Sequence, residues 1–135
     1  MTRVVSDNVP DATTLTGLQL AVMRAIWERG EATVTDVHRA LTRRRLAPTT
    51  VATLLARLEE RGLLQHRTDG RQYVYSATVT ETDVRRSMVS ELTDLLFDGD
   101  PAELVTHLVR DREISRGDLA RVRKMLDEHD KRRQR

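Results

Sequence analysis

The chain contains no cysteine and very few aromatic residues, and both absences narrow what it can be. Among its 135 residues are one Trp, one Phe and two Tyr, so aromatics make up only 3%. Without thiols there is no disulfide, no thiolate metal site and no thiol redox switch. The 39% hydrophobic and 33% charged residues predict a folded chain with a core mainly of Leu, Val, Ile and Ala.

Long hydrophobic runs are missing as well. The longest apolar runs span only a few residues, whereas a membrane-spanning helix needs roughly 20. Residues 1–13 are mixed and polar, and they lack the apolar centre of a signal peptide. We therefore expect a disordered lead over residues 1–13, no membrane insertion and a cytoplasmic location.

Signatures of catalysis are also missing. The sequence has no Gly-rich phosphate loop, no HExxH pattern and no recognisable Ser/His/Asp grouping. Its four histidines are scattered over four segments, which is typical of surface or interface residues rather than of metal ligands. The stretch DGDP at 98–101 is typical of a helix-capping loop rather than of a Mg²⁺ site. We expect no enzymatic activity, no metal site and no cofactor.

Positive charge is concentrated in one part of the chain. Residues 34–78 hold eight Lys/Arg and four Asp/Glu, a net charge of +4, whereas residues 79–127 hold eight and eleven, a net charge of −3. This distribution suggests that only the first segment meets a polyanion such as nucleic acid. Chance clustering of solvated charge is the alternative.

Three helical segments followed by a hairpin predict the first domain. Capping-box patterns at Thr16-x-x-Gln19 and Thr33-x-x-Asp36, Pro48 as a first helical residue, and apolar periodicity indicate helices over about 16–29, 34–43 and 48–61. After them, β-branched and aromatic residues flank Asp69-Gly70, a favoured tight turn. This order predicts a winged helix-turn-helix domain over residues 14–78, with a generic small α+β domain as the alternative.

The rest of the chain predicts a helical dimerisation domain over residues 79–127, followed by a basic tail at 128–135. Three short helices have too little partner surface within one chain to bury their apolar stripes, so a second copy would supply it. Docking onto the chain's own winged domain is the alternative. The whole chain is thus expected to be mainly α with a small β-hairpin wing. The predicted interface residues are Met88, Leu92, Leu95, Leu96, Leu104, Leu108, Leu119, Val122 and Leu126.

The third predicted helix carries an unusual threonine face. On a helical wheel its large apolar residues share one side, whereas Thr49, Thr50 and Thr53 lie opposite, near the N-terminus. Small side chains let a helix approach base edges in the DNA major groove. Threonine methyls can pack on thymine methyls, and the hydroxyls can bond bases or phosphates. The alternative is that the threonines merely cap the helix.

Candidate phosphate contacts surround this face. The helix N-terminus offers free N–H groups and a positive dipole end to a phosphate. The basic and aromatic candidates are Arg43, Arg44 and Arg45 before the helix, Arg57 on it, Arg67 and Arg71 in the hairpin, and Tyr73 behind the wing tip. Together with the threonines they predict a surface that binds double-stranded DNA.

Four stretches resemble the penicillinase-repressor and methicillin-resistance-repressor family (BlaI/MecI). They are LTGLQLAVMRAIWERGEATVTDVHRAL (15–41), APTTVATLLARLEERGLL (47–64), DGRQYVYSA (69–77) and ISRGDLARVRKML (114–126). The likeness covers roughly residues 14–127 and is more specific in the first 78 residues than beyond them.

The resemblance implies a homodimeric winged-helix repressor that binds palindromic operators overlapping promoters and blocks transcription. By position, the helix over 48–61 would enter the major groove with its three threonines facing bases. Arg57, Arg71 and Tyr73 would lie nearer the DNA backbone, and the helices within 80–127 would form the dimer. A protein-interaction module whose basic strip meets an acidic partner, or a repressor that senses a small ligand, are the alternative functions.

Three departures from the family bear on specificity and release. Family members often carry Lys or Gln where this chain has Thr49 or Ala52, which affects the operator sequence. In β-lactam-responsive members a membrane sensor triggers cleavage of an Asn–Phe bond. His107-Leu108 occupies that position here, so these two residues are the candidate proteolytic release site and a membrane sensor-protease pathway is a candidate partner. The copper-responsive branch uses a cysteine motif that this chain lacks.

Overall fold

The computed structural model describes residues 14–111 and 114–133. The predicted lead over residues 1–13 lies outside the described residues, as do residues 134–135 of the predicted tail. The chain divides into two compact units, and the boundary between Glu91 and Leu92 falls inside helix α4 (Glu81–Phe97). Among the described residues, none of the helices combines the length and the apolar character that crossing a membrane requires.

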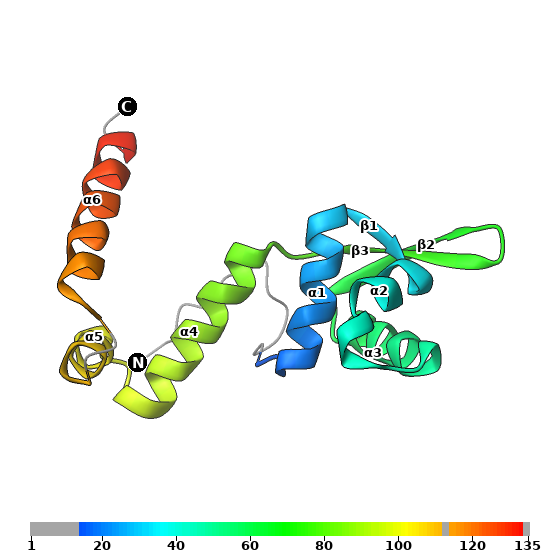
Figure 1. Cartoon of the computed structure of the whole chain (residues 1–135), viewed down its shortest axis with the longest axis horizontal. Helices are drawn as coiled ribbons and strands as arrows, with labels where there is room; N and C mark the ends of the chain where they lie inside the picture. The colour runs from blue at the N-terminus through cyan, green and yellow to red at the C-terminus, as the bar shows by residue number, and fades with distance from the viewer. Residues whose placement is uncertain (1–13, 112–113, 134–135) are drawn as a thin grey trace. The chain divides into compact units, whose positions relative to one another are not determined.

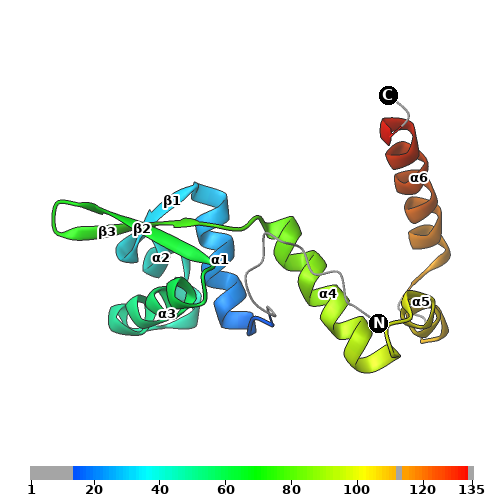
Figure 2. The ribbon, with the colours of Figure 1, turned by 180° about the vertical axis from the view of Figure 1, so that it is seen from behind.

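The first unit is a winged helix-turn-helix. Its elements before α4 are α1 (Gly17–Arg29), β1 (Glu31–Thr33), α2 (Val34–Ala40), the 3₁₀ turn η1 (Thr42–Arg44), α3 (Pro48–Glu60), β2 (Leu64–Asp69) and β3 (Gln72–Ala77). The strands form an antiparallel sheet in the order β1-β3-β2. Figures 1 and 2 show the β2–β3 hairpin extending beyond the three helices as the wing. The predicted fold class, mainly α with a small β wing, is confirmed.

Local sequence explains where the first helices begin. The Thr16 hydroxyl accepts the Gln19 amide at 3.1 Å, and the Gln19 side chain accepts the Thr16 amide at 3.0 Å. Thr33 and Asp36 form the same reciprocal pair at the start of α2, at 3.2 and 2.9 Å. The bond from the Thr33 amide lowers the pKa of Asp36 because it stabilises the charged carboxylate. Both capping boxes are therefore confirmed.

The second predicted helix is shorter than expected. It ends at Ala40, and the chain continues as η1 up to Arg44 instead of as an α-helix to residue 43. The Leu41 amide bonds both Val37 and His38 carbonyls at 3.1 Å, which tightens the last turn toward 3₁₀ geometry. This early end turns the chain toward α3.

The core of the first unit joins all its helices. Fully buried side chains come from α1, α2, α3 and the first turns of α4, and they include Met23, Val37, Leu55 and Val84. The Trp27 indole N–H donates to the Val79 carbonyl at 2.9 Å and ties α1 to the segment that leads into α4. The start of α4 therefore belongs to the winged-helix unit.

The second unit comprises the end of α4, α5 (Pro101–Arg110) and α6 (Arg116–Arg133). Asp100 caps α5 by accepting the Ala102 amide at 2.9 Å, and Ser115 and Asp118 form a capping box before α6. In the described part of α5 and α6, no residue is buried. Helix α6 continues past residue 127 to Arg133, so residues 128–133 of the predicted basic tail are helical. Basic residues in the last turn favour this extension.

Candidate nucleic-acid interface

Helix α3 presents its threonines on the surface. Val51, Leu55 and Leu58 are fully buried, whereas Thr49, Thr50 and Thr53 are exposed, as the helical wheel predicts. The N-cap residue is Ala47, and no side chain caps this end of α3 within the described residues. The alternative that the threonines serve as caps is therefore wrong.

The Thr53 hydroxyl has a specific partner within the helix. It donates to the Thr49 carbonyl at 3.0 Å, a bond back to the preceding turn. Its proton is thus engaged, and the methyl group and the remaining lone pair of the oxygen are what Thr53 offers to a partner. An apolar contact or an acceptor role suits this side chain better than a donor role.

Two features hold the start of α3 in place. The His38 ring of α2 donates from Nε2 to the Leu46 carbonyl at 2.8 Å, which ties the turn between the two helices to α2. Pro48 occupies the first helical position, where its missing N–H has no helical partner to lose and its fixed φ suits the helix. The N-terminal end of α3 is thus held by side-chain and backbone contacts before any ligand binds.

The predicted basic residues fall into two groups. Arg43 and Arg44 lie exposed on η1, and Arg57 lies exposed on α3. Arg67 is instead paired, because its Nε donates to the Glu31 carboxylate at 2.7 Å. That hydrogen bond raises the pKa of the Arg67 guanidinium. Arg67 therefore links β2 to β1 rather than standing free for a phosphate.

The wing turn lies one residue later than predicted. Asp69 pairs with Gln72, so the two loop residues are Gly70 and Arg71 rather than Asp69 and Gly70. Gly70 has φ +63°, a left-handed conformation that favours glycine at the first position of a two-residue hairpin loop. The result places Arg71 in the tip itself, exposed beyond both strands.

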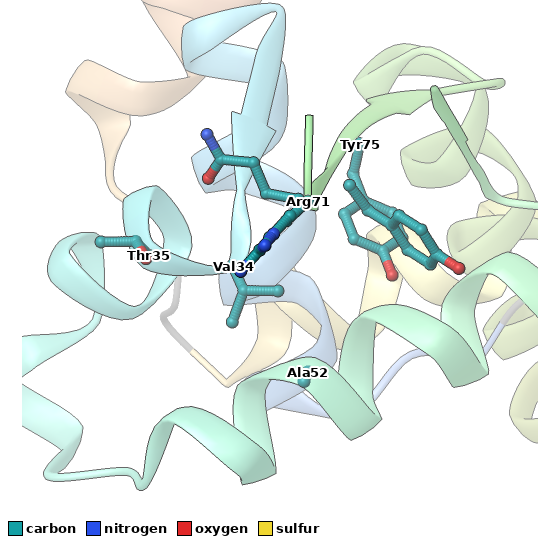
Figure 3. A pocket seen from close by; sticks show the side chains of 7 residues that line it. Val34, Thr35, Ala52, Arg71 and Tyr75 are labelled. Atoms are coloured by element: carbon teal, nitrogen blue, oxygen red, sulfur yellow. The ribbon is translucent and has the colours of Figure 1, made fainter. Parts of the chain in front are cut away.

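A hollow of about 390 Å³ lies between α3 and the wing. Figure 3 shows Ala52 on α3 at one side of it, with Val34, Arg71 and Tyr75 around it. Thr35, Gln72 and Tyr73 complete the lining. The sequence did not predict Val34, Thr35, Gln72 or Tyr75 in this place. Only Tyr75 had a signal: it alternates with the predicted Tyr73 along one strand and so shares its face of the sheet.

The structure places the remaining candidates elsewhere. His107 and Leu108 lie within α5, and His107 contacts the Asp111 carboxylate at 3.0 Å. A protease that cuts extended chains would need α5 to unwind before cleaving this bond. Met88, predicted in the interface, packs against the core of the first unit. The described residues contain no group of three or more side chains suited to a metal ion.

The order of the helices and the antiparallel hairpin define a winged-helix protein. A model of the penicillinase repressor family matches residues 15–128, and the chain belongs to this family of transcriptional repressors. It is similar to the penicillinase repressor of Bacillus licheniformis, with 25% identity over 116 residues, 85% of this chain and 91% of that protein. The methicillin resistance regulatory protein MecI of Mammaliicoccus sciuri is 23% identical, with 78% and 87% covered.

The solution structure of monomeric Bacillus licheniformis BlaI in complex with the blaP half-operator is 30% identical, with a TM-score of 0.46. The matched region covers 54% of this chain and 90% of the BlaI chain.

Proposed function

We propose that the protein is a homodimeric, cytoplasmic repressor that blocks promoters by binding palindromic operators. The observation that carries the proposal is the exposed, uncharged threonine face of α3, flanked by arginines on η1 and at the wing tip. A helix with such a face fits closely into the major groove, and the flanking arginines reach the phosphates on either side.

Base reading falls to the threonines in this proposal. Thr49 and Thr50 lie on the first turn, and Thr53 lies one turn further along. Because the Thr53 hydroxyl proton is engaged with Thr49, its methyl group is the natural contact for a thymine C5-methyl. Arg43, Arg44, Arg57, Arg71 and Tyr73 supply contacts to the DNA backbone, which fix register but carry no sequence information directly.

Dimerisation is proposed through the second unit. Several large apolar side chains of this unit are exposed to solvent in the single chain: Leu95 is 82% exposed, Leu96 64% and Met125 62%. Together with neighbouring residues on α5 and α6 they provide apolar area that a second copy can cover. Two copies related by a twofold axis would present two α3 helices to two half-sites. Because the half-sites would be related by the same twofold axis, we expect the operator to be palindromic.

Substitution of Thr53 tests the base-reading role. Thr53→Ala removes one methyl and the hydroxyl without changing charge. We expect the ratio of operator to random-duplex affinity to fall at least about fourfold per half-site, from about 0.8 kcal/mol for a buried methyl. The slope of affinity against salt should not change, because no phosphate contact is lost. Thr53→Val, which keeps a methyl group, should retain most of the ratio.

A matched control exists on another helix. The Thr106 hydroxyl of α5 bonds back to the Ala102 carbonyl at 2.8 Å, as Thr53 does to Thr49. Thr106→Ala should leave both affinities unchanged. Equal losses on operator and random duplex for Thr53→Ala would remove Thr53 from base reading. A salt-resistant complex with an acidic protein, without binding to promoter DNA, would instead favour a protein-interaction module.

A further inference from the structure

A histidine in the wing contacts α3, the recognition helix of the proposed DNA complex. His66 of β2 donates from Nδ1 to both carboxylate oxygens of Glu59 of α3, at 2.7 and 2.8 Å. A carboxylate only accepts hydrogen bonds, so the histidine nitrogen must be the donor. The side chains of His66 and Glu59 are 30% and 31% exposed, so the contact lies at the surface and is only partly screened from solvent.

The same histidine lies against both tyrosines of β3. Its ring stacks on Tyr73 with centroids 4.0 Å apart and planes 15° apart, and it meets Tyr75 at 5.7 Å. Tyr75 is buried opposite His66 in the ladder. Burial raises the pKa of the Tyr75 hydroxyl, and the negative charge of Glu59 adds to the effect. One ring therefore joins α3, β2 and β3.

We infer that His66 is a positioning residue that fixes the wing relative to the recognition helix. The inference rests on the proposed DNA-binding function and adds a residue that acts through Arg71. Tyr73, which His66 holds by stacking, is separated from Arg71 only by Gln72 along β3. Two-stranded ribbons twist and bend readily. A hydrogen bond and a stack midway along the hairpin therefore set where its tip lies.

The opposite face of the wing provides a matched contrast. Arg67 follows His66 on β2, and its side chain bonds Glu31 of β1 at 2.7 Å. That pair connects strands within one sheet and makes no link to α3. A variant that loses the Arg67–Glu31 ion pair keeps the contact between His66 and Glu59. Such a variant shows what the loss of any ion pair in the wing does, apart from the loss of the link to α3.

The test measures how much Arg71 contributes to DNA binding in different backgrounds. Arg71→Ala is combined with His66→Phe, with Glu59→Gln and with Glu31→Gln in the full-length protein. Each affinity is measured on a duplex that the wild-type protein occupies, and on a random duplex. Phe keeps a flat ring for the stack but cannot donate to Glu59, whereas Gln at position 59 keeps an acceptor. His66→Gln serves as a second variant, and thermal unfolding verifies that each variant is folded.

In the wild-type background we expect Arg71→Ala to weaken operator binding about tenfold, as loss of a charged hydrogen bond to phosphate does. With His66→Phe or His66→Gln the factor should shrink to about two- or threefold, because the wing tip no longer holds Arg71 at its phosphate. The loss caused by Arg71→Ala should stay near tenfold with Glu31→Gln, because that variant leaves the His66–Glu59 contact in place. With Glu59→Gln most of the tenfold loss should remain, because Gln still accepts a hydrogen bond from His66.

Two outcomes overturn the inference. An Arg71→Ala factor that is the same in the wild-type, His66→Phe and His66→Gln backgrounds shows that His66 affects stability alone. An Arg71→Ala variant that binds as well as the wild type leaves nothing for His66 to position. In both cases a wild-type preference for the operator keeps the proposed function intact, whereas absence of that preference removes the function itself.

Discussion

The two units of this chain differ in whether their large apolar side chains are buried or exposed. In the first unit, apolar side chains from every helix converge, and Leu55 of α3 is 0% exposed. In the second unit, residues of the same type at the same helical spacing are exposed, such as Leu95 at 82%. The first unit thus holds a closed core within one chain, whereas the second exposes apolar side chains that a second copy would cover in the proposed dimer. In the proposed dimer, the first unit reads DNA and the second unit joins the two copies.

Truncating a leucine in each unit gives the largest expected difference. Leu55→Ala should lower the free energy of unfolding of the first unit by about 2–5 kcal/mol, because it leaves a cavity in a packed core. Leu95→Ala should change it by less than about 0.5 kcal/mol at low protein concentration. Denaturant unfolding followed by fluorescence of Trp27, the one tryptophan of the chain, reports on the first unit. Equal losses would contradict the contrast.

A charge placed on the apolar surface should dissociate the dimer. Leu95→Asp or Leu92→Asp would bury an unpaired carboxylate in the proposed interface, which should weaken self-association at least about 100-fold, or about 2.7 kcal/mol. Sedimentation measures the association, and operator binding should weaken with it.

The control for this change is a charge elsewhere in the second unit. Ala120 of α6 is exposed and lies away from Leu119, Val122 and Leu126 on the helical wheel. Ala120→Asp should leave the association unchanged. Dimers that persist at wild-type strength in both leucine variants would show that the interface lies elsewhere.

A smaller effect is expected where the first unit holds the start of α4. Trp27→Phe removes the N–H that bonds the Val79 carbonyl. The free energy of unfolding should fall by about 1 kcal/mol, since one hydrogen bond of a partly buried group is lost. Circular dichroism in denaturant measures this loss. Amide exchange should also speed up in the first turns of α4 and stay unchanged in α5; uniform acceleration would show that α4 is not held through this bond.

The smallest effect concerns pH, and here the two units should behave alike. Hydrogen bonds from the Thr33 and Ser115 amides lower the pKa of Asp36 and of Asp118 below the usual 3.8. A lowered pKa in the folded state means that the stabilisation is present above the ordinary value and is lost as pH falls through the lowered one. Carboxyl titration by NMR should find both groups below 3.8. A value at or above 3.8 for Asp118 alone would mean that the capping box of α6 does not form in solution.

Sequence alone predicted the features that depend on local chemistry. The capping pairs at Thr16 and Thr33, the buried face of α3 and the exposure of Thr53 follow from side-chain type and helical spacing. Strand β1 was missed because Glu31–Thr33 is too short to show alternation, and it exists only through its pairing with β3.

Contacts between segments far apart in the chain could not be predicted from the sequence. Arg67 looked like a free phosphate contact, yet Glu31 neutralises it across the sheet. The link from His66 to Glu59 likewise depends on how the wing meets α3. The one-residue shift that moves Arg71 into the turn was decided by strand register rather than by the turn residues. The roles of the threonines, the arginines and the apolar interface residues remain predictions.

We propose that paired copies read DNA through the threonine face of α3. Footprinting at base resolution on chromosomal segments occupied by the wild-type protein is the direct test. We expect two inverted half-sites, protected in the major groove and separated by whole turns of about 10 base pairs, with thymine methyls inside each. A single protected half-site, or protection confined to phosphates without a base preference, would contradict it.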